Sequence, residues 1–344
     1  MTGCFQEKVD ETMRCAWYQE KGAAEDVLQV GEQPRPVPGS GEVLVAVRAS
    51  GINPSDTKSR GGARGNKAMP FPLIIPHQDG AGVIEAVGAG ISEDRIGERV
   101  WIHEAQLGRP FGTAAQYVAI PSVNAVPMPD GLSFVEGAAL GVPALTAHRC
   151  VFADGPVEGK TVLVTGGAGA VGFYAIQFAR QSGARVIATI GDERQARIAR
   201  EAGADLVVDR RRQDVVAEAA AFAGADGERS VDRIVEVAFG ANLGDSLRML
   251  KANGVIATYS SDEQPEPPLP FWPLVLLDAT IRFVLVYAMT RQAHEEAIAY
   301  VNRAACEGWL RHNIGQVLPL DRIAEAHKLV ETGPKFGRVI LEIE

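Results

Sequence analysis

Residues 161–180 read TVLVTGGAGAVGFYAIQFAR, and this stretch decides the fold class of the chain. It opens with a short apolar run that predicts a buried strand. It ends with apolar residues at helical spacing, including Val171, Ala175 and Phe178. Between the two lies the pattern G-x-G-x-x-G, in which residues 167, 169 and 172 are the glycines. A strand, a glycine-rich turn and a helix in this order are typical of a dinucleotide-binding βαβ unit.

Each glycine of the turn has a physical role in such a unit. Gly167 permits the tight turn, Gly169 lets the backbone approach a pyrophosphate, and Gly172 lets helix and strand pack closely. The helix that begins near Ala170 and Val171 offers free N–H groups and a partial positive charge to the phosphates. A glycine-rich turn standing alone can be only a turn, so the surrounding pattern matters.

The following residues continue the alternation of short apolar runs and helix-length segments. The runs are TVLVT, RVIATI, DLVV, RIVEV, VIATY and FVLVY, the last of them residues 283–287. Six such strands with helical crossovers predict a doubly wound parallel sheet of the α/β class.

The two ends of the chain have a different rhythm. From Gly41 to about Ile120, short strands are separated by glycine turns, which predicts a small β-rich unit. After about Thr290 come a helix, a strand, a second helix and a final strand, and we expect this tail to return to the β-rich unit. The predicted domains are therefore 1–143 together with 289–344, and 144–288 for the nucleotide-binding part.

The composition of the 344 residues excludes several classes of protein. Hydrophobic residues make up 46% and charged residues 22%, as in ordinary globular proteins, and the formal net charge is −9. Phosphate-backbone binding needs a basic surface, so no nucleic-acid partner is expected. The most hydrophobic stretch, Trp272 to Ala288, is interrupted by Asp278 and Arg282, so no membrane span is expected either. The four cysteines form no C-x-x-C pair, which favours a reducing, cytoplasmic location.

The end of the second parallel strand bears on which dinucleotide is bound. An NAD site usually carries an acidic residue there for the ribose 2′-OH, whereas this strand ends at Ile190 and Gly191. Asp192 and Glu193 come after the glycine, where they fit the first turn of the next helix. Arg194 and the run Arg210-Arg211-Arg212 could bind a 2′-phosphate, and Arg194 and Arg210 are the residues we predict; alternatively, these arginines form a solvated face paired with acids. We predict NADPH over NADH because the acid is missing.

Several segments together resemble a known family. GINPSDTKSRGG (51–62), PHQDGAGVIEAVG (76–88), ALGVPALTAHR (139–149) and the segment around the glycine-rich turn are similar to the zinc-independent medium-chain dehydrogenase/reductases, in the NADPH:quinone reductase (zeta-crystallin-like) branch. The resemblance runs from about Met13 to the C-terminus and leaves residues 1–12 as an unmatched extension. It implies a Rossmann domain inserted into a GroES-like β-rich catalytic domain, with the active site in the cleft between them.

The resemblance also allows a check for the catalytic zinc of zinc-dependent relatives. Their Cys, His and Cys ligands match Asn53, Gln78 and Val142 in this chain. Amides are poor zinc ligands and Val is none, so no metal is expected. His77, beside Gln78, lacks partners for a metal site and is expected to be an ordinary polar or capping residue. Hydride would then pass from the nicotinamide directly to an electron-poor acceptor.

The resemblance assigns roles to further residues. Asn53 is expected near the nicotinamide, where its amide could donate to an oxyanion, although it is also a turn residue before a proline. Lys58 stands where related quinone reductases carry Tyr, and it either donates to an oxyanion or points into water. Thr146 matches a threonine near the nicotinamide. Arg338 matches a basic residue that reaches the pyrophosphate. Ser55 matches a proton-relay hydroxyl whose role is expected to be void without zinc.

The predicted function is NADPH-dependent reduction of a small-molecule electron acceptor, a quinone or a similar conjugated carbonyl. Two alternatives remain open at this point. One is a 2-enoyl thioester or alkenal reductase of the same superfamily, and the other is a non-catalytic, crystallin-like NADPH-binding protein. The apolar run 283–287 is expected at a sheet edge, where pairing with a second copy would give a homodimer.

Overall fold

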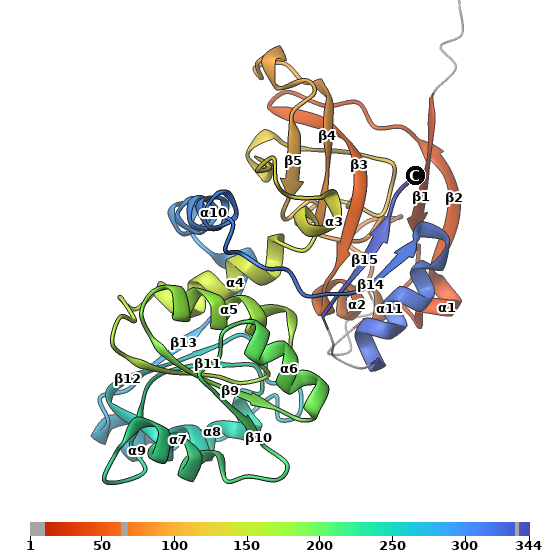
Figure 1. The fold of residues 1–344 in the computed structure, drawn as a ribbon. Helices are drawn as coiled ribbons and strands as arrows, with labels where there is room; N and C mark the ends of the chain where they lie inside the picture. Colours follow the sequence, from red (N-terminus) through yellow and green to blue (C-terminus); the bar gives the residue numbers. More distant parts are fainter. Residues whose placement is uncertain (1–10, 63–67, 334–336) are drawn as a thin grey trace, which may run out of the picture.

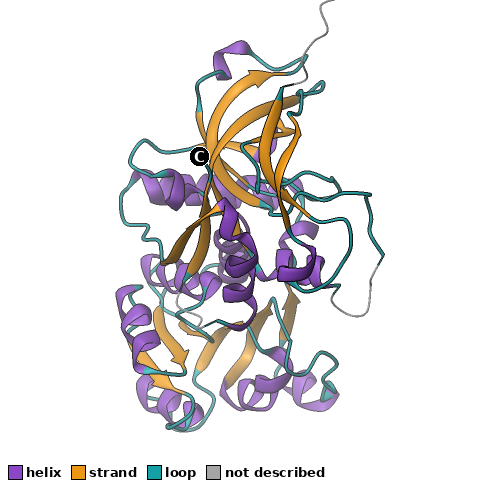
Figure 2. Ribbon diagram, turned by 90° about the vertical axis from the view of Figure 1, so that its right-hand side faces the viewer, coloured by secondary structure: helices purple, strands orange, loops and turns teal. Residues whose placement is uncertain are grey.

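The computed structural model describes residues 11–62, 68–333 and 337–344. The greater part of the unmatched N-terminal extension, residues 1–10, lies outside the described residues. The chain forms two lobes, each built around its own sheet, with the C-terminus in the lobe that also holds the first strands (Figures 1 and 2).

One lobe contains a parallel sheet of six strands in the spatial order β10-β9-β8-β11-β12-β13. Its strands are β8 (Thr161–Val164), β9 (Arg185–Ile190), β10 (Leu206–Asp209), β11 (Val231–Glu236), β12 (Leu250–Thr258) and β13 (Thr280–Phe283). Counted along the chain, this order is 3-2-1-4-5-6, that of the Rossmann fold. The predicted doubly wound parallel sheet is therefore confirmed.

Helices cover both faces of this sheet (Figure 1). The helices that connect its strands are α5 (Ala170–Gln181), α6 (Glu193–Glu201), α7 (Val215–Ala223), α8 (Phe239–Met249) and α9 (Phe271–Leu276). Val162 and Val164 of β8 pack in the core that includes α5 and α6, whereas Leu163 between them packs with α7 and α8. Both faces are buried, which explains why the sequence shows continuous apolar runs rather than alternation.

The other lobe contains a mixed seven-stranded sheet in which both ends of the chain meet. Its strands are β3 (Glu42–Ile52), β4 (Asp79–Val87), β5 (Arg99–Ile102), β6 (Tyr117–Pro121), β7 (Ala125–Pro127), β14 (Ile314–Pro319) and β15 (Arg338–Glu342). The C-terminal β15 pairs antiparallel with β3, and β14 pairs parallel with β15. A separate antiparallel pair is formed by β1 (Thr12–Trp17) and β2 (Gln29–Pro34).

Further helices pack on this lobe and between the lobes. They are α1 (Ala24–Val27), α2 (Pro54–Gly61), α3 (Phe134–Gly137), α4 (Gly141–Phe152), α10 (Arg291–Cys306) and α11 (Ile323–Thr332). Ala144 of α4 and Ala297 of α10 belong to the same core as α5, so these helices join the two lobes. The domain boundaries at residues 143 and 289 stay a prediction.

One strand differs from its sequence prediction. The sixth parallel strand was expected over residues 283–287, but β13 ends at Phe283. Residues 286–288 form a 3₁₀ turn, because Val284 pairs with the end of β12 and the chain then leaves the sheet. The edge position of the strand is confirmed. The early end of β13 sets Tyr287 beyond the sheet, where it faces the other lobe.

Candidate functional site

The glycine-rich turn joins β8 to α5 at the carboxyl edge of the parallel sheet. Gly166 has a φ of +64°, a left-handed conformation that favours glycine. A Cβ on Gly172 would lie 2.4 Å from the carbonyl oxygen of Gly166, and one on Gly167 would lie 2.8 Å from Ala188 Cβ. The turn therefore packs against α5 and β9 at distances that only glycine permits.

The first turn of α5 is open to an anion. Its N-cap residue is Gly169, and no side chain caps the helix. The first N–H groups of a helix have no partner within it, so those at Ala170 and Val171 can bind a phosphate. Asn313 fixes the turn from the other lobe by donating from Nδ2 to the carbonyl oxygen of Ala168 (3.2 Å).

A buried carboxyl group supports the same turn from β11. Glu236 Oε1 accepts hydrogen bonds from Thr165 Oγ1 (2.8 Å) and from the N–H of Ala238 (2.6 Å). Burial raises the pKa of Glu236. Thr165 Oγ1 in turn accepts from the N–H of Val237 (2.9 Å), so the ends of β8 and β11 are tied together. This point, where the strand order reverses, is where ligands bind in open α/β sheets.

The two acidic residues that follow β9 belong to the start of α6. Asp192 is the N-cap of α6 and accepts from the N–H of Gln195 (2.9 Å). Gln195 Oε1 accepts from the N–H of Gly191 (2.8 Å). The expectation that Asp192 belongs to the start of the next helix is confirmed.

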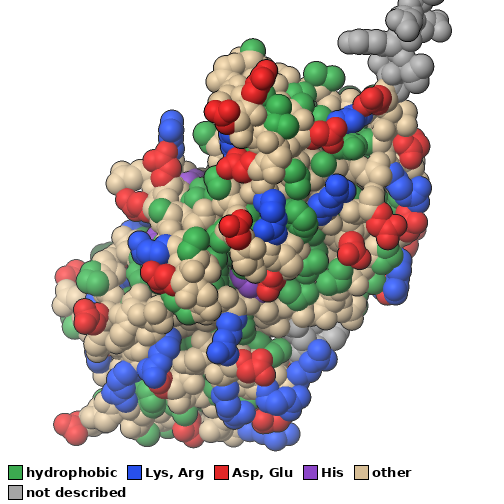
Figure 3. Space-filling model, turned by 45° about the horizontal axis from the view of Figure 1, so that its top comes forward, with side chains coloured by type: hydrophobic (Ala, Val, Ile, Leu, Met, Phe, Trp, Pro, Cys, Tyr) green, Lys and Arg blue, Asp and Glu red, His purple; other side chains and the backbone are tan. Residues whose placement is uncertain are grey.

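The side chain that lies against Gly191 belongs to the predicted arginine run, but it is Arg211 rather than Arg210. A Cβ on Gly191 would lie 3.4 Å from Arg211 Cζ, so this guanidinium lies against the glycine. The backbone N–H of Arg210 donates to Ile190 O (3.1 Å), and Arg194 lies in the first turn of α6. Figure 3 shows basic side chains gathered at its lower right, the side on which Figure 1 places α6 and β10.

Across the cleft, Asn53 lies in a buried polar network. Its Nδ2 donates to Asp79 Oδ2 (2.8 Å), and its Oδ1 accepts from Arg338. Arg338 also forms an ion pair with Asp79 (3.1 Å), and both side chains are buried. Burial raises the pKa of Asp79, and the positive charge of Arg338 opposes this rise. The structure thus places Arg338 beside Asn53, where it holds the amide in a fixed orientation.

The three positions that match zinc ligands of relatives are occupied by other contacts. Besides the bonds of Asn53, Gln78 Oε1 accepts from the N–H of Gln106 (3.1 Å). Val142 contributes its backbone N–H to Asp79 Oδ1 (3.0 Å) at the start of α4. His77 contacts Ser50 and His327 through its two ring nitrogens, each at 2.8 Å. His77 is therefore a buried polar residue, as expected.

Lys58 does not stand free in the cleft. Its Nζ bonds both carboxylate oxygens of Asp262, at 2.7 and 2.8 Å. Lys58 belongs to α2, and Asp262 follows β12 in the other lobe, so this ion pair spans the cleft. The side chains are 45% and 68% exposed. Lys58 was expected either to donate to an oxyanion or to point into water. In the structure it does neither, because its ammonium group is paired with Asp262.

Sequence reasoning missed a tyrosine that enters the site from the other lobe. Tyr287 Oη lies 2.8 Å from Ser55 Oγ, at the start of α2. Burial raises the pKa of Tyr287 well above its ordinary value, and the charges of Asp56 and Asp79 act in the same direction. The phenol therefore stays protonated. No sequence signal marks this residue, because its position depends on where β13 ends.

Two further residues lie on the helices that border the cleft. Thr146 is buried in α4. Asp56, in the first turn of α2, accepts from the N–H of Asn53 (2.7 Å). Burial raises the pKa of Asp56 to about 7, and the charge of Asp79 adds to this rise. A carboxyl group that titrates near neutrality thus lies beside Ser55.

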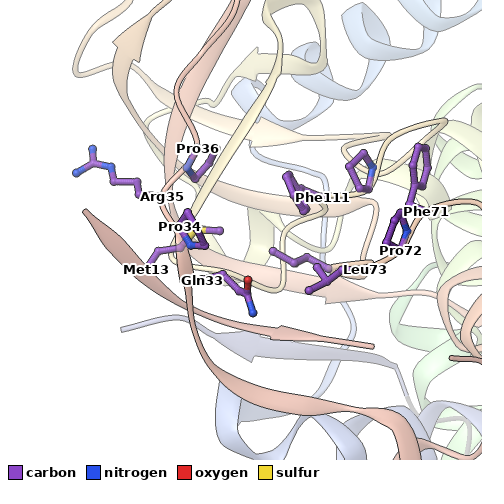
Figure 4. Close-up of a pocket in the computed structure, with 11 residues that line it drawn as sticks. Met13, Gln33, Pro34, Arg35, Pro36, Phe71, Pro72, Leu73 and Phe111 are labelled. Atoms are coloured by element: carbon purple, nitrogen blue, oxygen red, sulfur yellow. The ribbon is translucent and has the colours of Figure 1, made fainter. Parts of the chain in front are cut away.

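Two pockets flank these elements. The one of about 490 Å³ lies outside the cleft, beside β1 and β2, and Figure 4 shows its proline and aromatic side chains. Its charged residue, Arg35, bonds Glu11 and Glu85 and faces no reactive group. The pocket of about 380 Å³ lies at the carboxyl ends of β12 and β13, the same edge of the sheet as the glycine-rich turn. Its lining comes from the parallel-sheet lobe and includes Phe239, Tyr259 and Phe283.

Comparisons with known proteins agree with this geometry. Residues 39–130 match the family model for the alcohol dehydrogenase GroES-like domain, and residues 170–303 match that of the zinc-binding dehydrogenases. The quinone oxidoreductase of Rattus norvegicus is 30% identical over 313 residues, which cover 89% of this chain and 90% of that protein.

Solved structures extend the likeness over nearly the whole chain. The mycobacterial protein Rv1454c in complex with NADPH has a TM-score of 0.82 and 27% identity, covering 96% of this chain and 99% of that one. An NAD-dependent alcohol dehydrogenase has a TM-score of 0.85 and 30% identity, covering 96% of this chain and 100% of that one.

Among the described residues, no helix combines the length and the hydrophobicity needed to cross a bilayer.

Proposed function

Because the chain belongs to the medium-chain dehydrogenase/reductase family, with the quinone oxidoreductases, we propose that this oxidoreductase uses NADPH to reduce a quinone or a similar conjugated carbonyl. The observation that carries the proposal is the glycine-rich turn, whose close packing leaves the N-terminus of α5 open to a pyrophosphate. NADPH, when bound, supplies the hydride. The acceptor takes up the hydride and one proton and becomes a hydroquinone or a saturated carbonyl compound.

We propose that hydride transfer in this cleft needs no zinc at the family position. The amide of Asn53 is bonded to Asp79 and Arg338, and an amide and an apolar side chain occupy the other two positions. Such groups do not form a zinc site. In this proposal the Asn53 amide keeps one N–H beyond the bond to Asp79, and that N–H faces the reacting groups.

Tyr287 is proposed as the hydrogen-bond donor to the acceptor oxygen. Its raised pKa keeps the phenol protonated, and Ser55 holds the hydroxyl at the start of α2. A protonated donor aimed at developing negative charge stabilises the transition state. The phenol that related quinone reductases carry at the position of Lys58 is thereby replaced from the opposite lobe.

The direct test is NADPH oxidation followed by absorbance with a panel of quinones, alkenals and 2-enoyl thioesters. We expect turnover with quinones or alkenals after chelator treatment, and a loss on the order of 100-fold in kcat for Tyr287→Phe with unchanged NADPH affinity. Tyr300→Phe, on the distant helix α10, is the matched control and should keep full activity. Tight NADPH binding without turnover of any acceptor would instead favour the non-catalytic, crystallin-like role. Preference for thioesters would favour the enoyl reductase.

The 2′-phosphate of NADPH is proposed to bind at the end of β9, with Arg211 as its main partner and Arg194 and Arg210 beside it. Arg211→Ala should weaken NADPH binding about tenfold or more and leave NADH binding unchanged, because a charged hydrogen bond contributes about 1.5–3 kcal/mol. Arg212→Ala is the control, since that side chain is 85% exposed and lies 3.7 Å from Asp209. Equal losses for both cofactors would contradict the assignment.

We also propose a cytoplasmic homodimer. The edge strand β13 ends at Phe283, which is 69% exposed, and Trp272 and Leu276 of α9, the helix that precedes β13 in the chain, are 69% and 80% exposed. Apolar side chains at an unpaired sheet edge favour pairing with a second copy. Light scattering of the purified protein should give twice the chain mass, and Phe283→Lys should give a monomer. Buried Cys15 and Cys150, both free thiols, are consistent with a reducing compartment.

A further inference from the structure

A cluster of three side chains lies outside the cofactor site, where the end of β5 meets the first turn of α10. His103 and Glu104 directly follow β5, and His294 belongs to α10. The side chains are largely buried, with exposed fractions of 6%, 11% and 13% in that order. Residues far apart in the chain thus bring two imidazoles and a carboxylate together inside the protein.

The nitrogen and oxygen atoms of this cluster lie within ion-pair distance of one another. Glu104 Oε1 lies 3.2 Å from His294 Nε2, and Glu104 Oε2 lies 3.6 Å from His103 Nδ1. Even so, Glu104 Oε1, His294 Nε2 and both ring nitrogens of His103 are buried and have no hydrogen-bond partner. Buried polar atoms in native proteins are rarely left unsatisfied, and each such atom needs an explanation.

The ligand atoms of the three residues lie close enough together to surround one metal ion. One ligand atom from each residue lies within 4.8 Å of the others. In a tetrahedral zinc site with bonds of about 2.0–2.1 Å, ligand atoms are separated by about 3.3–3.4 Å. The separation of Glu104 Oε1 from His294 Nε2, 3.2 Å, is close to that value, and the 3.6 Å contact to His103 Nδ1 is made by the other carboxylate oxygen, Oε2. Two imidazoles and one carboxylate are also a ligand set that zinc takes in proteins.

The backbone supports the same arrangement. Glu104 has a φ of +54°, which is unfavourable for a residue with a side chain. The backbone of His103 is held at both its polar groups by Asn124, whose Nδ2 donates to His103 O and whose carbonyl accepts from His103 N–H. The ring of Trp101 packs against the His103 ring, with centroids 5.7 Å apart.

We propose that His103, Glu104 and His294 bind one divalent transition-metal ion, with Zn²⁺ as the best fit, at the contact between β5 and α10. The site shares no residue with Asn53, Gln78 and Val142, the positions that match the family's catalytic zinc. Its role is to tie α10, which packs between the lobes, to the sheet of the β-rich lobe, next to the bond from Trp101 Nε1 to Asn302 Oδ1 (2.9 Å). The proposal is independent of the hydride chemistry.

The test measures metal binding rather than turnover. Chelator-treated protein is titrated with Zn²⁺ in a calorimeter, and Co²⁺ is added in parallel to record the visible absorption of a tetrahedral N/O site. We expect one Zn²⁺ per chain and a rise in Tm of roughly 5 °C at a hundredfold excess over Kd. His103→Ala and His294→Ala should each weaken binding at least 100-fold, whereas His148→Gln, in α4, should leave it unchanged.

Each result of the zinc titrations either supports or overturns the proposed site. Absence of saturable Zn²⁺ binding, or binding that survives both alanine substitutions, would overturn the proposal. If the alanine variants fail to fold, Glu104→Gln decides, because it keeps the shape of the side chain and removes the charged ligand. Wild-type affinity in folded Glu104→Gln would equally overturn the site, and a loss of at least tenfold would support it.

Discussion

The substitution Gly172→Ala tests the cofactor site most directly, because the structure predicts its effect from a single contact. An added Cβ would lie 2.4 Å from Gly166 O and 3.0 Å from Gly167 Cα, whereas ordinary van der Waals contact begins at 3.4 Å. Gly172 lies inside α5, so alanine fits its backbone conformation, and only the contact opposes the change. The turn and the helix must therefore separate by about 1 Å (3.4 − 2.4).

The size of the effect follows from that displacement. Overpacking of this kind costs about 1–3 kcal/mol of stability, reduced by up to about 1 kcal/mol because alanine favours a helix. The N–H groups at the start of α5 move with the turn, and a misplacement of about 1 Å can cost on the order of 100-fold in function. We therefore expect the Kd for NADPH to rise on the order of 100-fold.

The assay compares three variants by NADPH titration and urea unfolding. Gly244→Ala is the matched control, because Gly244 lies in α8 with no atom within 4 Å of the added Cβ. Gly244→Ala should raise the free energy of unfolding by up to about 1 kcal/mol and leave the NADPH affinity unchanged. Gly169→Ala, whose added Cβ would lie 3.2 Å from the nearest atom, should lose NADPH affinity to a degree between those of the other two variants. Wild-type NADPH affinity in Gly172→Ala would refute the reasoning, and so would an equal loss in Gly244→Ala.

Three further predictions test other contacts. The pKa of Asp56 is raised to about 7 in the folded state, above an unfolded value near 4, so the stability that this group contributes is lost as the pH rises from about 4 to about 7. Asp56→Asn should therefore reduce the fall of the free energy of unfolding with pH, measured by urea unfolding from pH 4 to pH 8. An unchanged dependence on pH would contradict the assignment. Lys58→Met should lower the free energy of unfolding by less than about 1 kcal/mol, and adding Asp262→Asn should lower it no further, because the ion pair is exposed; additive losses would show that the two residues act separately. Arg233→Met should cost about 3 kcal/mol or more in thermal unfolding, because the buried guanidinium of Arg233 donates to three backbone carbonyl groups; a loss below about 1 kcal/mol would show that water replaces it.

Local patterns were enough to predict the architecture. The apolar runs and the glycine spacing around residues 161–180 correctly predicted a strand, a tight turn and a helix, because these features depend on side-chain burial and on backbone freedom within a short segment. The end of β13 was predicted wrongly, since residues 283–287 remain apolar beyond the sheet. An apolar run predicts that a segment is buried, but it does not show whether the segment is a strand paired in the sheet or a turn packed against the other lobe.

Side chains that act across the cleft could not be predicted in the same way. The sequence showed that Lys58 stands where relatives carry tyrosine, yet nothing in it indicated that Tyr287 lies beside Ser55. It placed an arginine run near the ribose but did not distinguish Arg211 from Arg210. These contacts join residues far apart in the chain, and their distances depend on how the two lobes pack.

The sequence by itself determined the Rossmann sheet and the glycine-rich turn, because each depends on the chemistry of residues at fixed local spacing. The tertiary structure alone decided that Asn53 is held by Asp79 and Arg338. It alone also brought His103 and Glu104 to His294. The physical reason is the same in both cases: hydrogen bonds and metal coordination act over about 2–3.5 Å, and only the packing of distant segments sets separations on that scale.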